Sequence, residues 1–302
     1  MTAQLRAHLL LLLWTALVAS SFPVAALFNA ELSTNFLVSL RFIAAGVVML
    51  VFMRDRTLPS PLALLIYSIL GLLLASFFSI MFKALQYTTP LTLAALFVSQ
   101  PLFAYLISML IRIETLQWKR LGTLLLAALA ALVIVSRADL ERLAGFHLGF
   151  GETLFLGGCV LSACYNNLSR YASDRHLIPS RPYRTTCYSL LSGGVLIGIP
   201  DLLIGDLGSF FATLGLTDLS ALGYLTLFTT LITFWVLQIA TLRLPPSTVA
   251  AYGYMPPMLV LYAELILGTT AWVSGYLLAT LMLISSMLLL SNSDRQAEKR
   301  AA

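Results

Sequence analysis

Residues 83–103 read KALQYTTPLTLAALFVSQPLF, and residues 238–258 read QIATLRLPPSTVAAYGYMPPM. A shift of 155 residues places the first stretch on the second, so that Pro90 meets Pro245 and Pro101 meets Pro256. Both stretches are apolar and predicted to be helical, and in both the two prolines stand eleven residues apart. A match of this kind within one chain indicates an internal duplication, which determines the architecture of the whole protein.

The composition is that of a membrane protein. A soluble domain carries about 25% charged residues, whereas this chain has 10% charged and 59% hydrophobic residues. The net charge of +5 comes from basic residues in short loops and not from one basic face, so we expect no nucleic-acid partner. The three cysteines and three histidines show no metal-ligand spacing, and we predict neither a metal nor a cofactor.

Ten apolar segments are long enough to cross a hydrocarbon layer as helices. We place them at residues 7–27, 33–53, 64–84, 91–111, 118–136, 149–169, 185–204, 219–241, 246–267 and 271–291. The first segment also has the features of a secretory signal peptide, and the alternative is a cleaved leader followed by nine helices. We prefer ten, because removal of the first segment leaves the second half of the chain without a partner for its own first helix.

Basic residues predict the orientation in the membrane. With the N-terminus inside, the inside segments hold 14 of the 18 Lys and Arg residues, and the outside loops hold only Arg137 and Arg142. This bias predicts that both termini are cytoplasmic, in a multi-pass protein of the plasma (inner) membrane. Five helices in each half put the halves in opposite orientations, as two inverted repeats at residues 1–145 and 146–302.

Several short motifs resemble a known family. The motifs are LLLWTALVASSF at residues 11–22, the pair Arg41-Phe42, the step Gln100-Pro101, and Glu114 followed by Gly122. Together they resemble the EamA-type members of the drug/metabolite transporter superfamily. Thr269 departs from the pattern, since the family usually has a glutamate near this place in the second half. The resemblance implies a ten-helix exporter or permease, with a central cavity walled by helices 1–4 and 6–9 and with helices 5 and 10 at the periphery.

One face of the expected helix 64–84 is polar, with members at helical spacing: Ser76, Ser79, Lys83 and Gln86. A polar stripe in a membrane helix is expected to face protein or water. Trp235 and Gln238 lie on or beside the matching face in the second half, which makes Lys83 and Gln238 a symmetric pair. The alternative for Lys83 is an anchoring role, because it stands near the outer end of its helix and its ammonium group can reach the membrane surface.

The expected helices 91–111 and 246–267 contain prolines, and each proline frees a carbonyl one turn earlier. A freed carbonyl in lipid must find a partner or line a wet cavity.

Asn166 lies in a polar row of the expected helix 149–169. It is a candidate to face the substrate cavity, and the alternative is an ordinary helix–helix hydrogen bond. Arg41 and Glu264 are charges within helices, and each is either structural or functional.

The candidate substrate-binding residues are therefore Trp14, Arg41, Ser79, Lys83, Phe97, Gln100, Asn166, Trp235, Gln238, Tyr252 and Met255, with Pro101 and Pro256 as hinges and Glu264 as the candidate for proton coupling. The predicted function is a secondary transporter, and not an enzyme, that exports small organic metabolites such as amino acids or related compounds by alternating access around a central cavity. The alternatives are a channel, a non-transporting scaffold, or an intramembrane enzyme. The predicted partners are a small-molecule substrate, the lipid bilayer, protons as a coupling ion, and a second copy of the chain through the peripheral helices.

Overall fold

The computed structural model describes residues 3–53, 58–136, 139, 148–179, 181–241, 244, 249 and 251–301. Within these residues every regular element is a helix. The first part of the chain holds α1 (Ala3–Ala25), α2 (Thr34–Phe52), α3 (Pro61–Ala84), α4 (Pro90–Phe97), α5 (Gln100–Leu110) and α6 (Trp118–Val135). The second part holds α8 (Phe150–Asp174), α9 (Pro182–Leu203), α10 (Leu207–Thr213), α11 (Leu216–Thr226), the π-helix η1 (Leu227–Ile232), α12 (Thr233–Thr241), the 3-10 helix η2 (Tyr252–Tyr254), α14 (Pro256–Ile266) and α15 (Gly275–Ala301).

Local sequence signals explain where many helices begin. Ser33, Ser60 and Thr89 each accept a hydrogen bond from a backbone N–H in the first turn of α2, α3 and α4. Pro61 and Pro182 stand in the first turn of α3 and α9, where a missing N–H costs no intrahelical hydrogen bond. Apolar sequence between these start signals then supplies the long helices.

Among the described residues, seven helical stretches are long and apolar enough to cross a membrane: Leu5–Ala25, Thr34–Phe52, Pro61–Ala84, Pro90–Leu110, Trp118–Val135, Pro182–Leu203 and Leu216–Leu237. They coincide with seven of the ten expected spans. The other three expected spans fall on α8, on α14 and the short η2 before it, and on α15, whose apolar part Gly275–Leu290 is shorter. The count of ten spans and the inverted repeat therefore stay predictions.

The two proline-containing spans are interrupted at matching places. The expected continuous helix 91–111 is divided at Val98 and Ser99 into α4 and α5, because Pro101 cannot donate to the Phe97 carbonyl, where α4 ends. In the second half, η2 precedes α14, which begins at Pro256. The shift of 155 residues places Pro101 on Pro256, so both breaks occupy equivalent positions.

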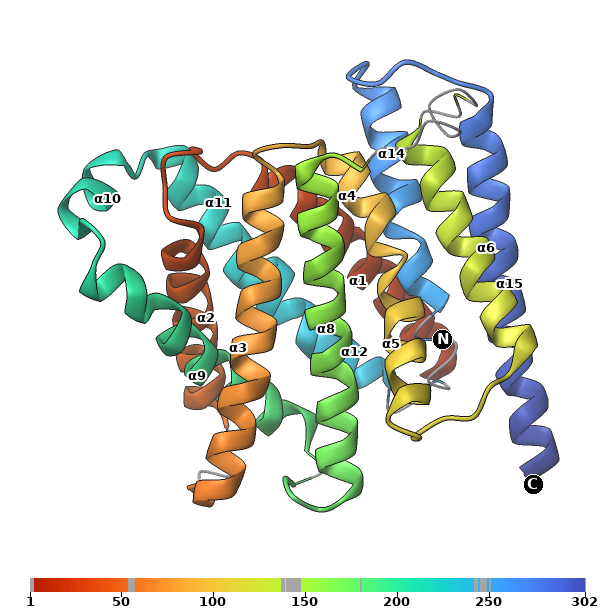
Figure 1. The fold of residues 1–302 in the computed structure, drawn as a ribbon, viewed down its shortest axis with the longest axis horizontal. Coiled ribbons are helices and arrows are strands. Elements are labelled where there is room, and N and C mark those ends of the chain that lie inside the picture. Colours follow the sequence, from red (N-terminus) through yellow and green to blue (C-terminus); the bar gives the residue numbers. More distant parts are fainter. Residues whose placement is uncertain are drawn as a thin grey trace.

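The helices pack as a bundle in which α9 lies against both α2 and α3, and α3 also packs along α8 (Figure 1). Helices α6 and α15 pack against each other at one edge, on the right in Figure 1. The loops that follow α5 and α8 lie at the lower end of this view, and the loops that follow α3 and α14 lie at the upper end. The boundary at residues 145/146 lies outside the described residues.

Candidate functional site

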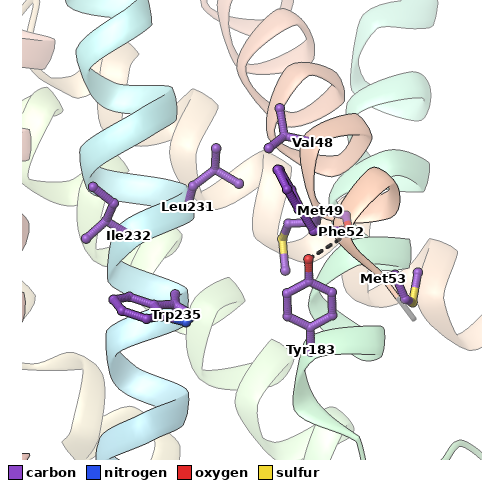
Figure 2. Close-up of a pocket in the computed structure, with 8 residues that line it drawn as sticks. All are labelled: Val48, Met49, Phe52, Met53, Tyr183, Leu231, Ile232 and Trp235. Carbon is purple, nitrogen blue, oxygen red and sulfur yellow. Dashed lines mark hydrogen bonds between the residues drawn. The ribbon is translucent and has the colours of Figure 1, made fainter. Parts of the chain in front are cut away.

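A cavity of about 590 Å³ lies between α2, the first turn of α9, and the η1–α12 segment. Its lining residues are Val48, Met49, Phe52, Met53, Tyr183, Leu231, Ile232 and Trp235. Figure 2 shows Leu231, Ile232 and Trp235 along one helix and Met49, Phe52 and Tyr183 across the gap from them. This volume falls in the range of about 300–1,000 Å³ that is typical of sites for small organic ligands.

The walls of this cavity are apolar and rich in aromatic and sulfur-containing side chains. All eight lining residues are uncharged. The Tyr183 hydroxyl donates to the Met49 carbonyl oxygen at 2.7 Å, which gives the phenol a partner and joins α9 to the end of α2. Phe52 and Trp235 remain 75% and 57% exposed, so their rings are available to a ligand. Flexible Met side chains and planar rings adapt to organic bodies of different shape.

Arg41 lies on the same face of α2 as Val48, two turns away from it, and its side chain is fully buried. Its Nε donates to Thr230 Oγ1 at 2.8 Å, and its Nη2 donates to Thr229 Oγ1 at 3.0 Å. The guanidinium carbon lies 4.5 Å from the centre of the Phe78 ring, within the distance of a cation–π contact. Arg41 therefore connects the first half of the chain to the π-helix of the second half.

The π-helix η1 has a local chemical explanation. The hydroxyls of Thr229 and Thr230 both donate to the Leu225 carbonyl oxygen, at 2.9 and 3.0 Å, and Thr233 donates to the Thr229 carbonyl. Threonine hydroxyls that bond to preceding carbonyls compete with the regular helix ladder. Short π-helical segments occur frequently at functional sites, and this one forms part of the cavity wall through Leu231 and Ile232.

Trp14, Tyr252 and Met255 come together in a second cluster, at the contact between α1 and the η2–α14 region. The Tyr252 hydroxyl lies 2.9 Å from His8 Nδ1. The carbonyl freed one turn before Pro256 is that of Tyr252, and Thr15 Oγ1 approaches it at 3.5 Å. The residues of this cluster thus pack against one another or form hydrogen bonds within the protein.

Phe97 packs against Phe22 and Phe77, with ring centroids 6.0 and 6.1 Å apart. Gln100 and Pro101 are half-buried in the first turn of α5, directly after the break in the helix. None of these three residues lines the cavity between α2 and α12. Their roles as substrate ligand or hinge stay predictions.

The polar residues on one face of α3 lie in different environments. Ser79 is buried and bonds to Thr34 and Asn35 of the neighbouring helix α2, at 3.1 Å for the Thr34 hydroxyl. Lys83 is exposed, and its Nζ lies 5.7 Å from the centre of the Tyr87 ring. The described cavities do not include Lys83 among their lining residues. The side chain of Gln238, its proposed symmetric partner, lies outside the described residues.

Asn166 is exposed on α8, whereas the adjacent Asn167 is buried and donates to the Ala104 carbonyl oxygen of α5 at 2.9 Å. The helix–helix hydrogen bond considered for this region is therefore made by Asn167.

Glu264 is half-buried near the end of α14 and accepts a hydrogen bond from the Thr270 hydroxyl at 2.6 Å. Its carboxylate thereby holds the turn between α14 and α15.

Comparison with known proteins identifies the first half. Residues 5–136 match the EamA-like transporter family. These residues form an EamA-like domain. The resemblance drawn from the motifs is thus confirmed for this range, and the match is consistent with the drug/metabolite transporter superfamily.

The fold of the chain as a whole also has a known counterpart. A solved structure titled "Crystal structure of protein" aligns with 98% of this chain and 98% of its own, with a TM-score of 0.67 and 17% sequence identity. This likeness concerns the fold alone. A search of curated proteins finds no match. The seven apolar helices in the described part of the chain and the EamA-like domain support a multi-pass membrane protein.

Glu114 of the EamA-like domain joins the two halves at one end of the bundle. Its Oε2 pairs with Arg120 at 2.9 Å, and its Oε1 pairs with Arg170 of α8 at 2.8 Å. Arg170 is 55% exposed, so water screens this second contact. The motif position Glu114 is therefore an interhelical connector and lies outside the apolar cavity.

Sequence reasoning identified Trp235 and missed the other seven residues of the cavity. The missed residues are apolar or aromatic and lie in stretches where nearly every side chain is apolar. Met49 and Met53, four residues apart, and Tyr183 in the first turn of its helix are weak signals of a ligand-facing surface. A hydrophobic pattern does not distinguish a side chain that faces lipid from one that faces a cavity.

Proposed function

We propose that this chain is a secondary transporter that exports small organic metabolites, such as amino acids or related compounds, by alternating access. The EamA-like domain supports a membrane transporter of small molecules. The observation that carries the finer proposal is the cavity between α2 of the first half and η1–α12 of the second half. A site at the interface of two related halves is where alternating access requires the substrate to bind.

Equivalent helix contacts support two inverted repeats, at residues 1–145 and 146–302. In the second half, α8 packs against α3 and α5 of the first half. In the first half, α1 packs against α12 and α14 of the second half, which are the counterparts of α3 and α5 in the duplication. Reciprocal contacts of this kind are expected when two copies of one unit embrace each other.

An asymmetry between two equivalent contacts supports the exchange of conformations. Helix α9 packs closely along α3, whereas in the corresponding pair α2 touches α11 and the start of η1 and is separated by the cavity farther along, toward α12. We propose that the two halves exchange these arrangements, so that the α2–α12 contact closes when the α3–α9 contact opens. We further propose that the open end of the cavity faces the cytoplasm of the inner membrane, since the loop charges predict that side for the end of α2.

Counterflow in proteoliposomes tests transport. Vesicles that contain the purified protein are loaded with an unlabelled mixture of amino acids, and the entry of each radiolabelled amino acid is measured. A carrier gives faster entry when the same compound is present inside. Labelled entry that is fast and independent of the internal load identifies a channel, and no entry of any member of the mixture rejects amino acids as the substrate class.

A further inference from the structure

The side chain of Arg41 has no exposed surface, yet one of its nitrogen atoms lacks a partner. Nε and Nη2 donate to Thr230 and Thr229, and Nη1 is buried with no hydrogen-bond acceptor in the part of the chain that the structure describes. The salt bridges found among the described residues involve Arg120 and Arg170 but not Arg41. A buried cation is normally paired with an anion, because the loss of hydration is otherwise uncompensated.

The groups around Arg41 supply no negative charge to its guanidinium. Each threonine hydroxyl that accepts from Arg41 already donates its single hydrogen to the Leu225 carbonyl. Phe78 covers the guanidinium from another side, at 4.5 Å from its ring centre. The threonines and the ring are neutral, so none of them supplies the negative charge that a guanidinium fork binds best.

The position of Arg41 links it to the cavity. Seven residues separate it from Val48, which puts the two side chains on one face of α2 at a distance of roughly 10 Å along the helix axis. On the opposite wall, Thr229 and Thr230 immediately precede Leu231 and Ile232. Arg41 and the two threonines are thus buried next to the cavity along α2 and η1, although none of them is among the lining residues shown in Figure 2.

We propose that Arg41 binds the carboxylate of an amphipathic organic acid whose apolar body occupies the cavity lined by Met49, Phe52 and Trp235. This inference rests on the proposed function and narrows its substrate class to carboxylate-bearing compounds. The Nη2 contact with the Thr229 carbonyl is long, at 3.4 Å, and is the contact that a carboxylate replaces most readily. The bound acid then forms two parallel hydrogen bonds with Nη1 and Nη2.

Ligand binding to the purified protein tests this proposal without any transport step. The thermal unfolding of the wild-type protein in detergent is measured against benzoate and against benzamide, its neutral isostere, at constant pH and ionic strength. We expect benzoate to stabilise the protein with an apparent affinity at least tenfold higher than that of benzamide, because a charged group strengthens the hydrogen bonds. Acetate and chloride, tested alone, provide the comparison with free small anions.

Variants assign the effect to Arg41. Arg41→Met should bring benzoate to the affinity of benzamide, and Arg41→Lys should keep part of the preference. The control Lys119→Met removes an exposed positive charge on α6, away from the cavity, and should keep the full preference. A folded Arg41→Met protein that still prefers benzoate tenfold overturns the proposal, and so does stabilisation by chloride or acetate equal to that by benzoate.

Cysteine protection keeps the proposal testable if Arg41→Met does not fold. In a Cys164→Ser background, Val48→Cys places a reactive thiol in the cavity wall. Benzoate should slow its reaction with a maleimide, and benzamide at the same concentration should not. Equal protection by the two compounds, or none by either, contradicts the proposal. If benzoate binds through Arg41 but the protein shows no counterflow, the proposed transport function is rejected and the proposed carboxylate site is kept.

Discussion

Gly71 of α3 and Gly193 of α9 lie in direct backbone contact. A Cβ added at Gly71 would meet the Gly193 amide nitrogen at 2.6 Å and would overlap the Ser189 carbonyl oxygen. Small residues permit such close approach between membrane helices, where backbone packing drives association. In the proposed inverted repeat, the α3–α9 contact is the closed counterpart of the α2–α12 contact beside the cavity.

Gly71→Ala is expected to lower the stability of the folded protein by about 1–3 kcal/mol, the usual cost of an overpacked core. The measurement is thermal unfolding followed by circular dichroism. Gly157→Ala is the matched control, since a Cβ at this exposed glycine of α8 meets no atom within 4 Å. Ala is also the better helix former, so the control should be neutral or stabilising. Equal effects of the two substitutions would argue against the close contact.

Thr230→Val removes the acceptor of the Arg41 Nε hydrogen bond and leaves a second buried guanidinium nitrogen unsatisfied. We expect a loss of about 1–3 kcal/mol of stability, the cost of an unsatisfied buried group. Thr226→Val provides the control, because the Thr226 hydroxyl donates to the Leu222 carbonyl of its own helix. A Thr230→Val protein as stable as Thr226→Val would show that the Arg41 contact contributes little.

Leu231→Trp should fill the cavity and reduce counterflow at least tenfold while the protein remains folded, since the added ring occupies the space that a substrate needs. Leu227→Trp is the control one turn earlier, at a side chain that is 48% exposed and does not line the cavity. Proteoliposome counterflow and size-exclusion profiles are compared for both variants. Wild-type counterflow in Leu231→Trp would exclude this cavity from the transport path.

The proton-coupling hypothesis for Glu264 predicts that Glu264→Gln abolishes the pH dependence of uptake. The hydrogen bond with Thr270 gives this carboxylate a structural role as well, so the same change should lower stability by about 1 kcal/mol. Thr270→Val separates the two roles, because it removes that hydrogen bond and keeps the carboxylate. An unchanged pH profile in folded Glu264→Gln would end the coupling hypothesis.

The predicted orientation is tested by cysteine labelling in intact and in opened cells. A cysteine at exposed Thr115, between α5 and α6, should react only from the cytoplasmic side. A cysteine at exposed Ser209, in α10, should react only from outside. The Cys164→Ser background leaves only the buried Cys159 and Cys187. Labelling of both positions from one side would contradict the proposed inverted arrangement.

The exposed apolar faces of α6 and α15, with Leu129 and Leu281 among their residues, are where the predicted homodimer would form. Lipid covers such faces equally well in a monomer. Cross-linking of cysteines introduced at these two positions in native membranes would distinguish the two states. The dimer therefore stays a prediction that depends on this experiment.

The sequence by itself determined the membrane class, seven of the apolar spans and the position of the helix breaks. These features are local. A run of about 20 apolar residues is long enough to cross the hydrocarbon layer wherever it occurs, and Pro101 or Pro256 interrupts a helix because its own nitrogen lacks a hydrogen. The family motifs around Arg41, Gln100 and Glu114 are local as well, and they predicted the EamA-like domain.

Only the tertiary structure decided which side chains meet. Arg41 finds its partner Thr230 at a separation of 189 residues, and no periodicity within α2 indicates that contact. Val48 and Met49 resemble any lipid-facing residue in sequence, yet they line a cavity because α12 stands apart from α2 there. The π-helix that presents Thr229 and Thr230 arises from hydroxyl–carbonyl hydrogen bonds. Long-range packing fixes these relationships, and hydrophobic pattern does not encode them, because lipid and protein interior are equally apolar.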